Sequence, residues 1–137
     1  MTASTLCYTY CMTWKEFATT IEKLSSKIDF AHDIIIGIVR GGIVPARLLA
    51  TNLKVKDMYC LTVKKVGNKR IVTSDVLDDL TNKKILLVED MLETGKSLIV
   101  AKEYLEKKGA SVKTACLYTI PISEIKPDFY LKEISEV

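Results

Sequence analysis

The sequence predicts an α/β protein with a mostly parallel central sheet and helices on both faces. Two short apolar runs, Ile34 to Val39 and Ile85 to Val88, have the pattern of strands buried on both sides. Segments with helical spacing separate these runs, and buried strands that alternate with helices favour parallel pairing. A chain of 137 residues has the usual size of one domain, so we expect residues 1–137 to form a single domain.

The first half of the chain supplies a helix, a strand and a second helix. Thr13-Trp14-Lys15-Glu16 has the spacing of a capping box, and apolar residues then recur at helical intervals through Ile28. The strand over residues 34–39 is followed by two glycines. Pro45 suits the first turn of the next helix, which we expect to reach Asn52.

The second half supplies a hairpin, another strand–helix unit and a last strand. Strands are expected over 57–64 and 70–73, on either side of a polar turn with Gly67-Asn68 at its tip. After the strand over 85–88, helical spacing runs from Thr94 to Lys108 and stops at Gly109. A last core strand is expected over 112–118. The ligand-binding loops of such a sheet gather beyond the carboxyl ends of its strands.

Composition excludes several classes of function. Lysine and arginine number 20 against 17 acidic residues, and they are dispersed, so charge gives no indication of nucleic-acid binding. The apolar runs are too short to span a bilayer, and the first residues lack the pattern of a secretion signal, so we expect a cytoplasmic protein without membrane contact. His32 is the only histidine, which leaves Cys7, Cys11, Cys60 and Cys116 without a metal-ligand pattern; we expect reduced, packing cysteines.

The triplet Gly95-Lys96-Ser97 looks like the end of a nucleotide-binding P-loop. That loop needs a glycine five residues before Gly95, where its backbone N–H groups crowd around a triphosphate. This chain has Asp90 there, preceded by Glu89, and both would repel phosphate. These acids argue against a P-loop, and only hydrolysis of ATP would support one.

The same segment suits a sugar phosphate. Thr94 and Gly95 stand at the start of a helix, where unpaired N–H groups attract phosphate, while Glu89 and Asp90 suit hydroxyl groups or Mg²⁺. The alternative is that the acids only end a strand and Thr94 only caps a helix. Gly41 and Gly42, beside Arg40, can offer backbone N–H groups to a second anion. The alternative is that they form a plain turn between a strand and a helix.

Three stretches resemble a known family. ILLVEDMLETGKSL (85–98) resembles the signature of the type I phosphoribosyltransferases, in which a strand, two acids and a T-G turn bind 5-phosphoribosyl-1-pyrophosphate (PRPP). It is most similar to the hypoxanthine-guanine and xanthine-guanine enzymes. IVRGGIVPARLLA (38–50) resembles the family's pyrophosphate loop, and IKPDFYL (125–131) resembles the segment that covers the base. The resemblance implies the family's fold, with a small hood formed by the N- and C-terminal segments.

The resemblance implies roles for the residues that bind PRPP. Glu89 and Asp90 would hold the ribose hydroxyls and lie near Mg²⁺, the expected cofactor. Arg40 and Gly41 would meet the pyrophosphate, in the family often through a cis peptide. The residues expected to wrap the 5′-phosphate are Met91, Leu92, Glu93, Thr94, Gly95, Lys96 and Ser97.

It also implies roles on the side of the base. Glu93 would accept or donate the proton on the base ring nitrogen, a role that would benefit from partial burial raising its pKa. Phe129 would stack on the purine, and the backbone of Tyr130 would meet its edge. Glu136 would lie near a second Mg²⁺. The turn from Lys65 to Arg70 is a candidate lid.

The implied activity is Mg²⁺-dependent transfer of the phosphoribosyl group from PRPP to a purine base in purine salvage, most readily to hypoxanthine, guanine or xanthine. The products are a nucleoside 5′-monophosphate and pyrophosphate. The resemblance implies a homo-oligomer, either a dimer or a tetramer. The related enzymes read the 6-oxo group with a lysine that Leu117 to Pro121 lack, so either Lys126 or a backbone group substitutes, or the base differs. The alternative function is a PRPP-binding regulatory module without efficient catalysis.

Overall fold

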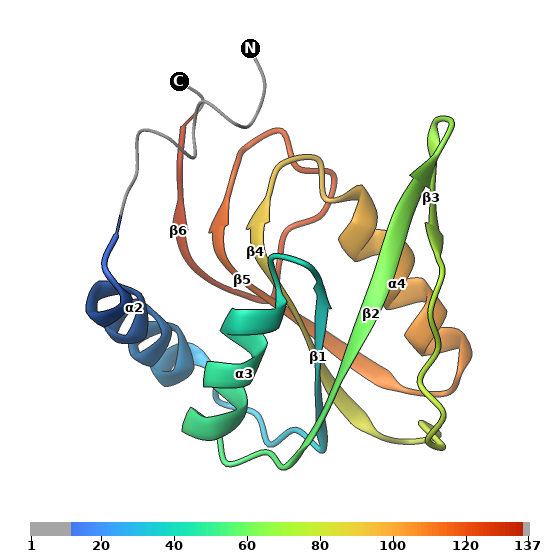
Figure 1. The fold of residues 1–137 in the computed structure, drawn as a ribbon, viewed down its shortest axis with the longest axis horizontal. Helices are drawn as coiled ribbons and strands as arrows, with labels where there is room; N and C mark the ends of the chain where they lie inside the picture. Colours follow the sequence, from blue (N-terminus) through green and yellow to red (C-terminus); the bar gives the residue numbers. More distant parts are fainter. Residues whose placement is uncertain (1–11, 136–137) are drawn as a thin grey trace.

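A six-stranded sheet forms the centre of the molecule (Figure 1). The computed structural model describes residues 12–135. The strands are β1 (Ile34–Val39), β2 (Asp57–Val66), β3 (Lys69–Val72), β4 (Lys84–Leu92), β5 (Ser111–Thr119) and β6 (Phe129–Glu133). They lie in the order β3-β2-β1-β4-β5-β6, and only β2 and β3 pair antiparallel. The predicted mostly parallel sheet is confirmed.

Helices cover both faces of this sheet, as predicted. Figure 1 shows α2 (Trp14–Lys27) and α3 (Ile43–Asn52) on one face and α4 (Lys96–Lys107) on the other. Ile35 and Leu86 are buried in the cluster beneath α2 and α3, whereas Ile36 and Leu87 are buried in the cluster beneath α4. Successive side chains of a strand point to opposite faces. The central strands therefore need apolar residues at every position, which explains the continuous apolar runs in the sequence.

The capping box at the start of α2 is present. The Thr13 side-chain oxygen accepts a hydrogen bond from the Glu16 N–H at 3.2 Å, and the Glu16 carboxylate accepts one from the Thr13 N–H at 2.6 Å. Ile21 and Leu24 are fully buried on the inner side of the helix. The cap fixes where the helix starts, and its apolar stripe holds it on the sheet.

Several element boundaries differ from the prediction. β4 continues past Val88 to Leu92, because Met91 and Leu92 still pair with β5. α4 begins at Lys96 instead of Thr94, since Gly95 in a left-handed conformation occupies the N-cap. α3 begins at Ile43, two residues before the expected proline. β6 was not predicted as a strand.

The two cysteines among the described residues differ in burial. Both are free thiols, and Cys116 is buried whereas Cys60 is exposed. The prediction that Cys60 packs in the protein interior was therefore wrong. The neighbouring Leu61 points to the α4 side, and strand alternation turns Cys60 to the opposite face. Cys7 and Cys11 lie outside the described residues.

Within residues 12–135, no helix is long and apolar enough to cross a membrane.

Candidate functional site

The predicted acids and the predicted phosphate turn line one cleft, where β4 passes into α4. Its walls are residues 89–97, and it has a volume of about 300 Å³. Glu89 and Asp90 lie on the last part of β4, and Ser97 lies in the first turn of α4. Glu93 and Thr94, in the turn between them, are exposed. The structure thus brings together every residue from Met91 to Ser97 that the sequence suggested for a phosphate.

Gly95 gives the turn its shape. Its φ angle is +79°, in the left-handed region that favours glycine. A Cβ atom at this position would lie 2.6 Å from the Ile125 Cγ2 atom and 2.7 Å from the Ser123 Oγ atom. The Glu124 N–H also donates a hydrogen bond to the Thr94 carbonyl at 2.8 Å. The turn is therefore fixed by its own backbone and by the segment that follows β5. The unpaired N–H groups at the N-terminus of α4, which this turn leads into, are of the kind that can attract an anion.

The two acids of the cleft have unequal surroundings. Burial raises the pKa of Glu89 to about 7, and the charge of Asp90 contributes in the same direction. Cys116 pairs with Glu89 in the sheet register, and burial, with help from the nearby acids, raises the pKa of its thiol to about 12. Asp90 is exposed, and its Oδ1 atom accepts a hydrogen bond from the Met91 N–H at 2.7 Å. Near neutral pH the Glu89 carboxyl can both donate and accept hydrogen bonds, which suits the recognition of hydroxyl groups.

The Arg40 loop meets the acids at Gly41. A Cβ atom on Gly41 would lie 2.4 Å from the Asp90 Oδ2 atom, so any larger residue would collide with this carboxylate. The peptide bond between Val39 and Arg40 is cis. The Arg40 side chain is exposed. The two loops therefore meet at Gly41 and Asp90, at the edge where the carboxyl ends of parallel strands gather.

The residues expected to bind a base do not line the cleft. The Phe129 ring packs on the α2–α3 side of the sheet, with its centroid 6.2 Å from that of Phe30. Tyr130 packs on the opposite side, where the Lys126 Nζ atom lies 5.7 Å from its ring centroid. Glu136 lies outside the described residues. Base stacking by Phe129 therefore stays a prediction, because Phe129 does not line the cleft that holds the other site residues.

A second hollow, which the sequence did not suggest, shares Asp90 with the cleft. It has a volume of about 310 Å³, and Gly41 and Asp90 form its polar edge. The rest of the lining is mainly apolar: Met12, Thr13, Trp14, Phe17, Val44 and Pro45. Trp14 is 78% exposed although α2 is amphipathic. In the sequence, the only indication of this hollow was Trp14 itself, an aromatic residue on the solvent side of the first turn of α2.

Comparison with known proteins agrees with this geometry. The family model described as the phosphoribosyl transferase domain matches residues 12–137. The chain belongs to the phosphoribosyltransferase family. This phosphoribosyltransferase domain is 34% identical over 120 residues to a hypoxanthine-guanine phosphoribosyltransferase of Lactococcus lactis, covering 79% of the chain and 64% of the relative. It is 30% identical over 90 residues to a ribose-phosphate pyrophosphokinase of Haemophilus ducreyi, covering 66% of the chain and 28% of the relative.

Solved structures show the same type I phosphoribosyltransferase fold. A purine phosphoribosyltransferase from Pyrococcus horikoshii superposes with a TM-score of 0.84 at 34% identity, covering 90% of this chain and 86% of the other. A xanthine-guanine-hypoxanthine phosphoribosyltransferase of Helicobacter pylori has a TM-score of 0.75 at 18% identity, which supports the fold alone. The phosphoribosyltransferase domain spans less than two thirds of the length of the curated relatives described above.

Proposed function

We propose that this domain transfers the 5-phosphoribosyl group from PRPP to a purine base, as an enzyme of purine salvage. The observation that carries the proposal is the cleft in which Glu89 and Asp90 face the turn at the N-terminus of α4. This arrangement offers carboxylates to ribose hydroxyls and backbone N–H groups to a phosphate a few residues away. The similarity to a hypoxanthine-guanine enzyme and to a purine enzyme, both at 34% identity, supports a purine as the acceptor.

Each part of PRPP has a proposed partner. The turn from Met91 to Ser97 holds the 5′-phosphate, and Glu89 with Asp90 holds the ribose hydroxyls. Arg40 and Gly41 hold the pyrophosphate, and the closeness of Gly41 to the Asp90 carboxylate supports this assignment. The base partners Phe129 and Tyr130, the metal ligand Glu136, the cytoplasmic location, the oligomeric state and the extent of the domain stay predictions.

Glu89 and Asp90 fit the requirements of Mg²⁺. Among residues 12–135, no group of three or more acidic, histidine or cysteine side chains could hold a metal ion by itself. Mg²⁺ commonly keeps several water ligands and takes one or two carboxylates together with phosphate oxygens. The adjacent acids of β4 can supply that carboxylate contribution once PRPP is present. The ion would neutralise charge on the departing pyrophosphate.

The chain's own residues have three tasks in the proposed reaction. The bond between ribose C1 and the pyrophosphate oxygen breaks, and a bond from C1 to a base nitrogen forms. Glu93 takes the proton that this ring nitrogen loses. Arg40 stabilises the negative charge that develops on the leaving group, and the fixed turn keeps the ribose in place.

The direct test is pyrophosphate release from PRPP and Mg²⁺ with hypoxanthine, guanine, xanthine, adenine or uracil supplied separately. Release with at least one 6-oxopurine is the expected result, and it would show that the missing lysine has a substitute. Release only with adenine or uracil would correct the base. Tight PRPP binding without release for any base would refute the transferase and support the regulatory module. Glu93, which a module of that kind does not need, favours the enzyme.

A further inference from the structure

The segment between β5 and β6 contacts the turn that leads from β4 into α4. The Ile120 N–H donates a hydrogen bond to the Leu92 carbonyl at 3.1 Å, and the Glu124 N–H donates one to the Thr94 carbonyl at 2.8 Å. Figure 1 shows this segment arching beside the loop between β4 and α4. Two carbonyls of the turn are therefore held from the side of residues 120–124.

These two contacts determine which way the next N–H groups of the turn point. The peptide units that follow Leu92 and Thr94 are trans and planar, so each N–H points away from the carbonyl of its own unit. Because both carbonyls face the segment, the N–H groups of Glu93 and Gly95 face away from it. Among the described residues, neither N–H donates to a protein acceptor. The segment does not line the cleft, whose walls are residues 89–97, so both donors are available to an anion there.

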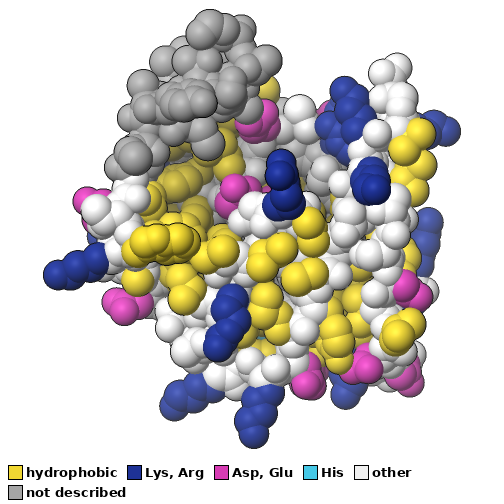
Figure 2. Space-filling model, viewed as in Figure 1, with side chains coloured by type: hydrophobic (Ala, Val, Ile, Leu, Met, Phe, Trp, Pro, Cys, Tyr) yellow, Lys and Arg dark blue, Asp and Glu magenta, His cyan; other side chains and the backbone are white. Residues whose placement is uncertain are grey.

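The negative charge of the cleft makes this orientation important. Glu89, Asp90 and Glu93 all line it, and Figure 2 shows acidic side chains over the end of β4. A carbonyl oxygen turned into the cleft would add to the negative potential there and would repel a phosphate. Successive N–H groups beside a left-handed residue, here Gly95, form a concavity that binds anions. The segment thus keeps two acceptors out of the cleft and leaves the matching donors in it.

Ser123 gives the segment its shape. Its hydroxyl donates a hydrogen bond to the Ile125 carbonyl at 2.8 Å and accepts one from the Ile125 N–H at 3.4 Å. The Ser123 N–H donates to the Ile120 carbonyl at 3.0 Å. The hydroxyl therefore closes a turn around Glu124, the residue whose N–H reaches the turn before α4. The Ser123 Oγ and Ile125 Cγ2 atoms are also the two nearest to a Cβ atom built on Gly95.

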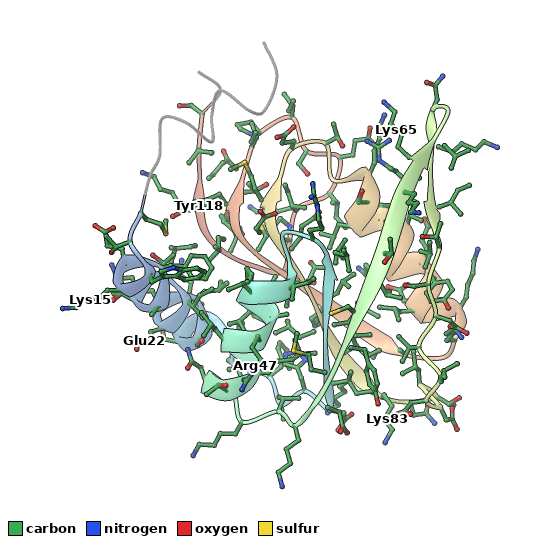
Figure 3. The ribbon with its side chains drawn as sticks, viewed as in Figure 1. Lys15, Glu22, Arg47, Lys65, Lys83 and Tyr118 are labelled. Carbon is green, nitrogen blue, oxygen red and sulfur yellow. The ribbon has the colours of Figure 1, made fainter. Side chains whose placement is uncertain are left out.

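Both ends of the segment are anchored in the sheet. Figure 3 labels Tyr118, which lies at the end of β5 where the segment begins, and the Ile120 side chain is buried. At the other end, the Asp128 Oδ2 atom accepts hydrogen bonds from the Thr114 N–H at 2.8 Å and from the Thr114 hydroxyl at 3.0 Å. With its ends held, the segment depends on the Ser123 turn for the position of its middle.

We propose that Ser123 is a positioning residue for the phosphate site. Its hydroxyl holds residues 120–125 in the shape that directs the Glu93 and Gly95 N–H groups toward the phosphate of a sugar phosphate. The inference rests on the proposed function, because it takes the turn to hold the 5′-phosphate. It adds to the site a residue outside the contiguous run of 89–97.

Two pairs of variants isolate the hydroxyl and the backbone donor. Ser123→Ala removes the hydroxyl, and Ile122→Ala is its control, because Ile122 is adjacent in the segment and its side chain is 59% exposed. Glu124→Pro removes the N–H that binds the Thr94 carbonyl, whereas Glu124→Ala keeps this N–H and changes the same side chain. Each pair therefore differs in one contact to the turn.

The test is calorimetric titration of the whole chain with ribose 5-phosphate and, separately, with inorganic pyrophosphate. Ser123→Ala and Glu124→Pro are each expected to weaken ribose 5-phosphate binding about fivefold or more, and their controls by less than about twofold. Pyrophosphate, which we propose to bind at Arg40 and Gly41, is expected to bind all variants alike. Equal weakening of both ligands in Ser123→Ala would indicate general damage to the fold and would contradict a positioning role.

Ribose 5-phosphate also separates failure of this inference from failure of the proposed function. Equal affinity for ribose 5-phosphate in the wild type and in Ser123→Ala would overturn the positioning role alone. Absence of ribose 5-phosphate binding in the wild type would overturn the phosphate site and the proposed transferase with it. Ser123→Ala leaves the backbone donors in place, so it decides the question even if Glu124→Pro does not fold.

Discussion

At the scale of single residues, Asp90 and Glu93 share a cleft but differ in what they touch. Asp90 contacts Gly41 and borders both hollows, whereas Glu93 is exposed in the turn. We expect Asp90→Asn to weaken PRPP binding about tenfold or more, because it removes a charged acceptor from the ribose hydroxyls. We expect Glu93→Gln to keep that affinity and to lower the turnover rate about a hundredfold or more.

Calorimetry for binding and single-turnover kinetics for rate measure the two effects separately. Ser97→Ala is a useful comparison, since it removes a side-chain hydroxyl that is proposed to bind the 5′-phosphate, without changing the charge of the protein. Equal losses of PRPP affinity in Asp90→Asn and Glu93→Gln would refute the division of roles between the acids.

His32 makes stability depend on pH. Both ring nitrogens are buried and lack a hydrogen-bond partner among the described residues. Burial lowers the pKa of His32 below 6.5; Asp33 opposes this shift, and Lys84 and Lys113 reinforce it. The unfolded chain therefore binds the proton more readily than the folded one, so this contribution is present above about pH 6.5 and is lost as the pH falls through the folded pKa.

Thermal melts of wild type and His32→Phe between about pH 7.5 and pH 5 measure this contribution. The variant keeps a ring beside Phe30 but cannot titrate. We expect the wild type to lose more stability than the variant as the pH falls. Parallel curves would show that His32 does not protonate differently in the two states.

At the scale of elements, the cap of α2 contributes a measurable part of stability. Thr13→Ala removes the side-chain acceptor of the capping box and is expected to cost about 1 kcal/mol of unfolding free energy. Thr19 is the matched control, because its hydroxyl only donates back to the Lys15 carbonyl in the same helix, at 3.0 Å. Urea unfolding of both variants provides the comparison. A loss in Thr19→Ala as large as that in Thr13→Ala would show that the cap is not the cause.

Gly95, before α4, is required by its backbone conformation and by the close packing around it, whereas Gly67, in the hairpin turn, is required only by its backbone conformation. Gly95 and Gly67 both have positive φ angles, but nothing lies within 4 Å of a Cβ atom built on Gly67. Gly67→Ala is expected to cost about 1 kcal/mol from the backbone alone. Gly95→Ala should cost more and also weaken orthophosphate binding, because Ser123 and Ile125 must move. Unfolding curves and phosphate titration measure both effects, and equal stability losses with intact binding would show that the contact is unimportant.

The sequence predicted elements well where one local signal determined them. The cap at Thr13 and the apolar run of β1 depend on neighbouring residues, and both are confirmed. β6 was missed because Phe129 and Tyr130 pack on opposite faces of a strand that exists only through pairing with β5. The extension of β4 through Glu89 and Asp90 has the same origin. Pairing supplied by a distant strand overrides a polar local sequence.

At the scale of the whole molecule, the same distinction explains which parts of the site were predictable. The acids and the turn are contiguous in sequence, so their chemistry was visible as a motif. The contact between Gly41 and Asp90 followed from the rule that the carboxyl ends of parallel strands meet at one edge. The hollow beside Trp14 depends on how α2 and α3 pack, and no local pattern specifies that packing.

Because one sheet separates two apolar clusters, both clusters should unfold together. Leu86 and Leu87 are adjacent in β4, fully buried, and belong to the clusters beneath α2–α3 and beneath α4, respectively. Leu86→Ala and Leu87→Ala are each expected to cost about 2–5 kcal/mol, since each leaves a cavity on one face. Urea unfolding followed by far-ultraviolet and near-ultraviolet circular dichroism should give one coincident transition for each variant, shifted by a similar amount. Two separate transitions in either variant would show that the faces of the sheet unfold independently, and the expected single domain would be wrong.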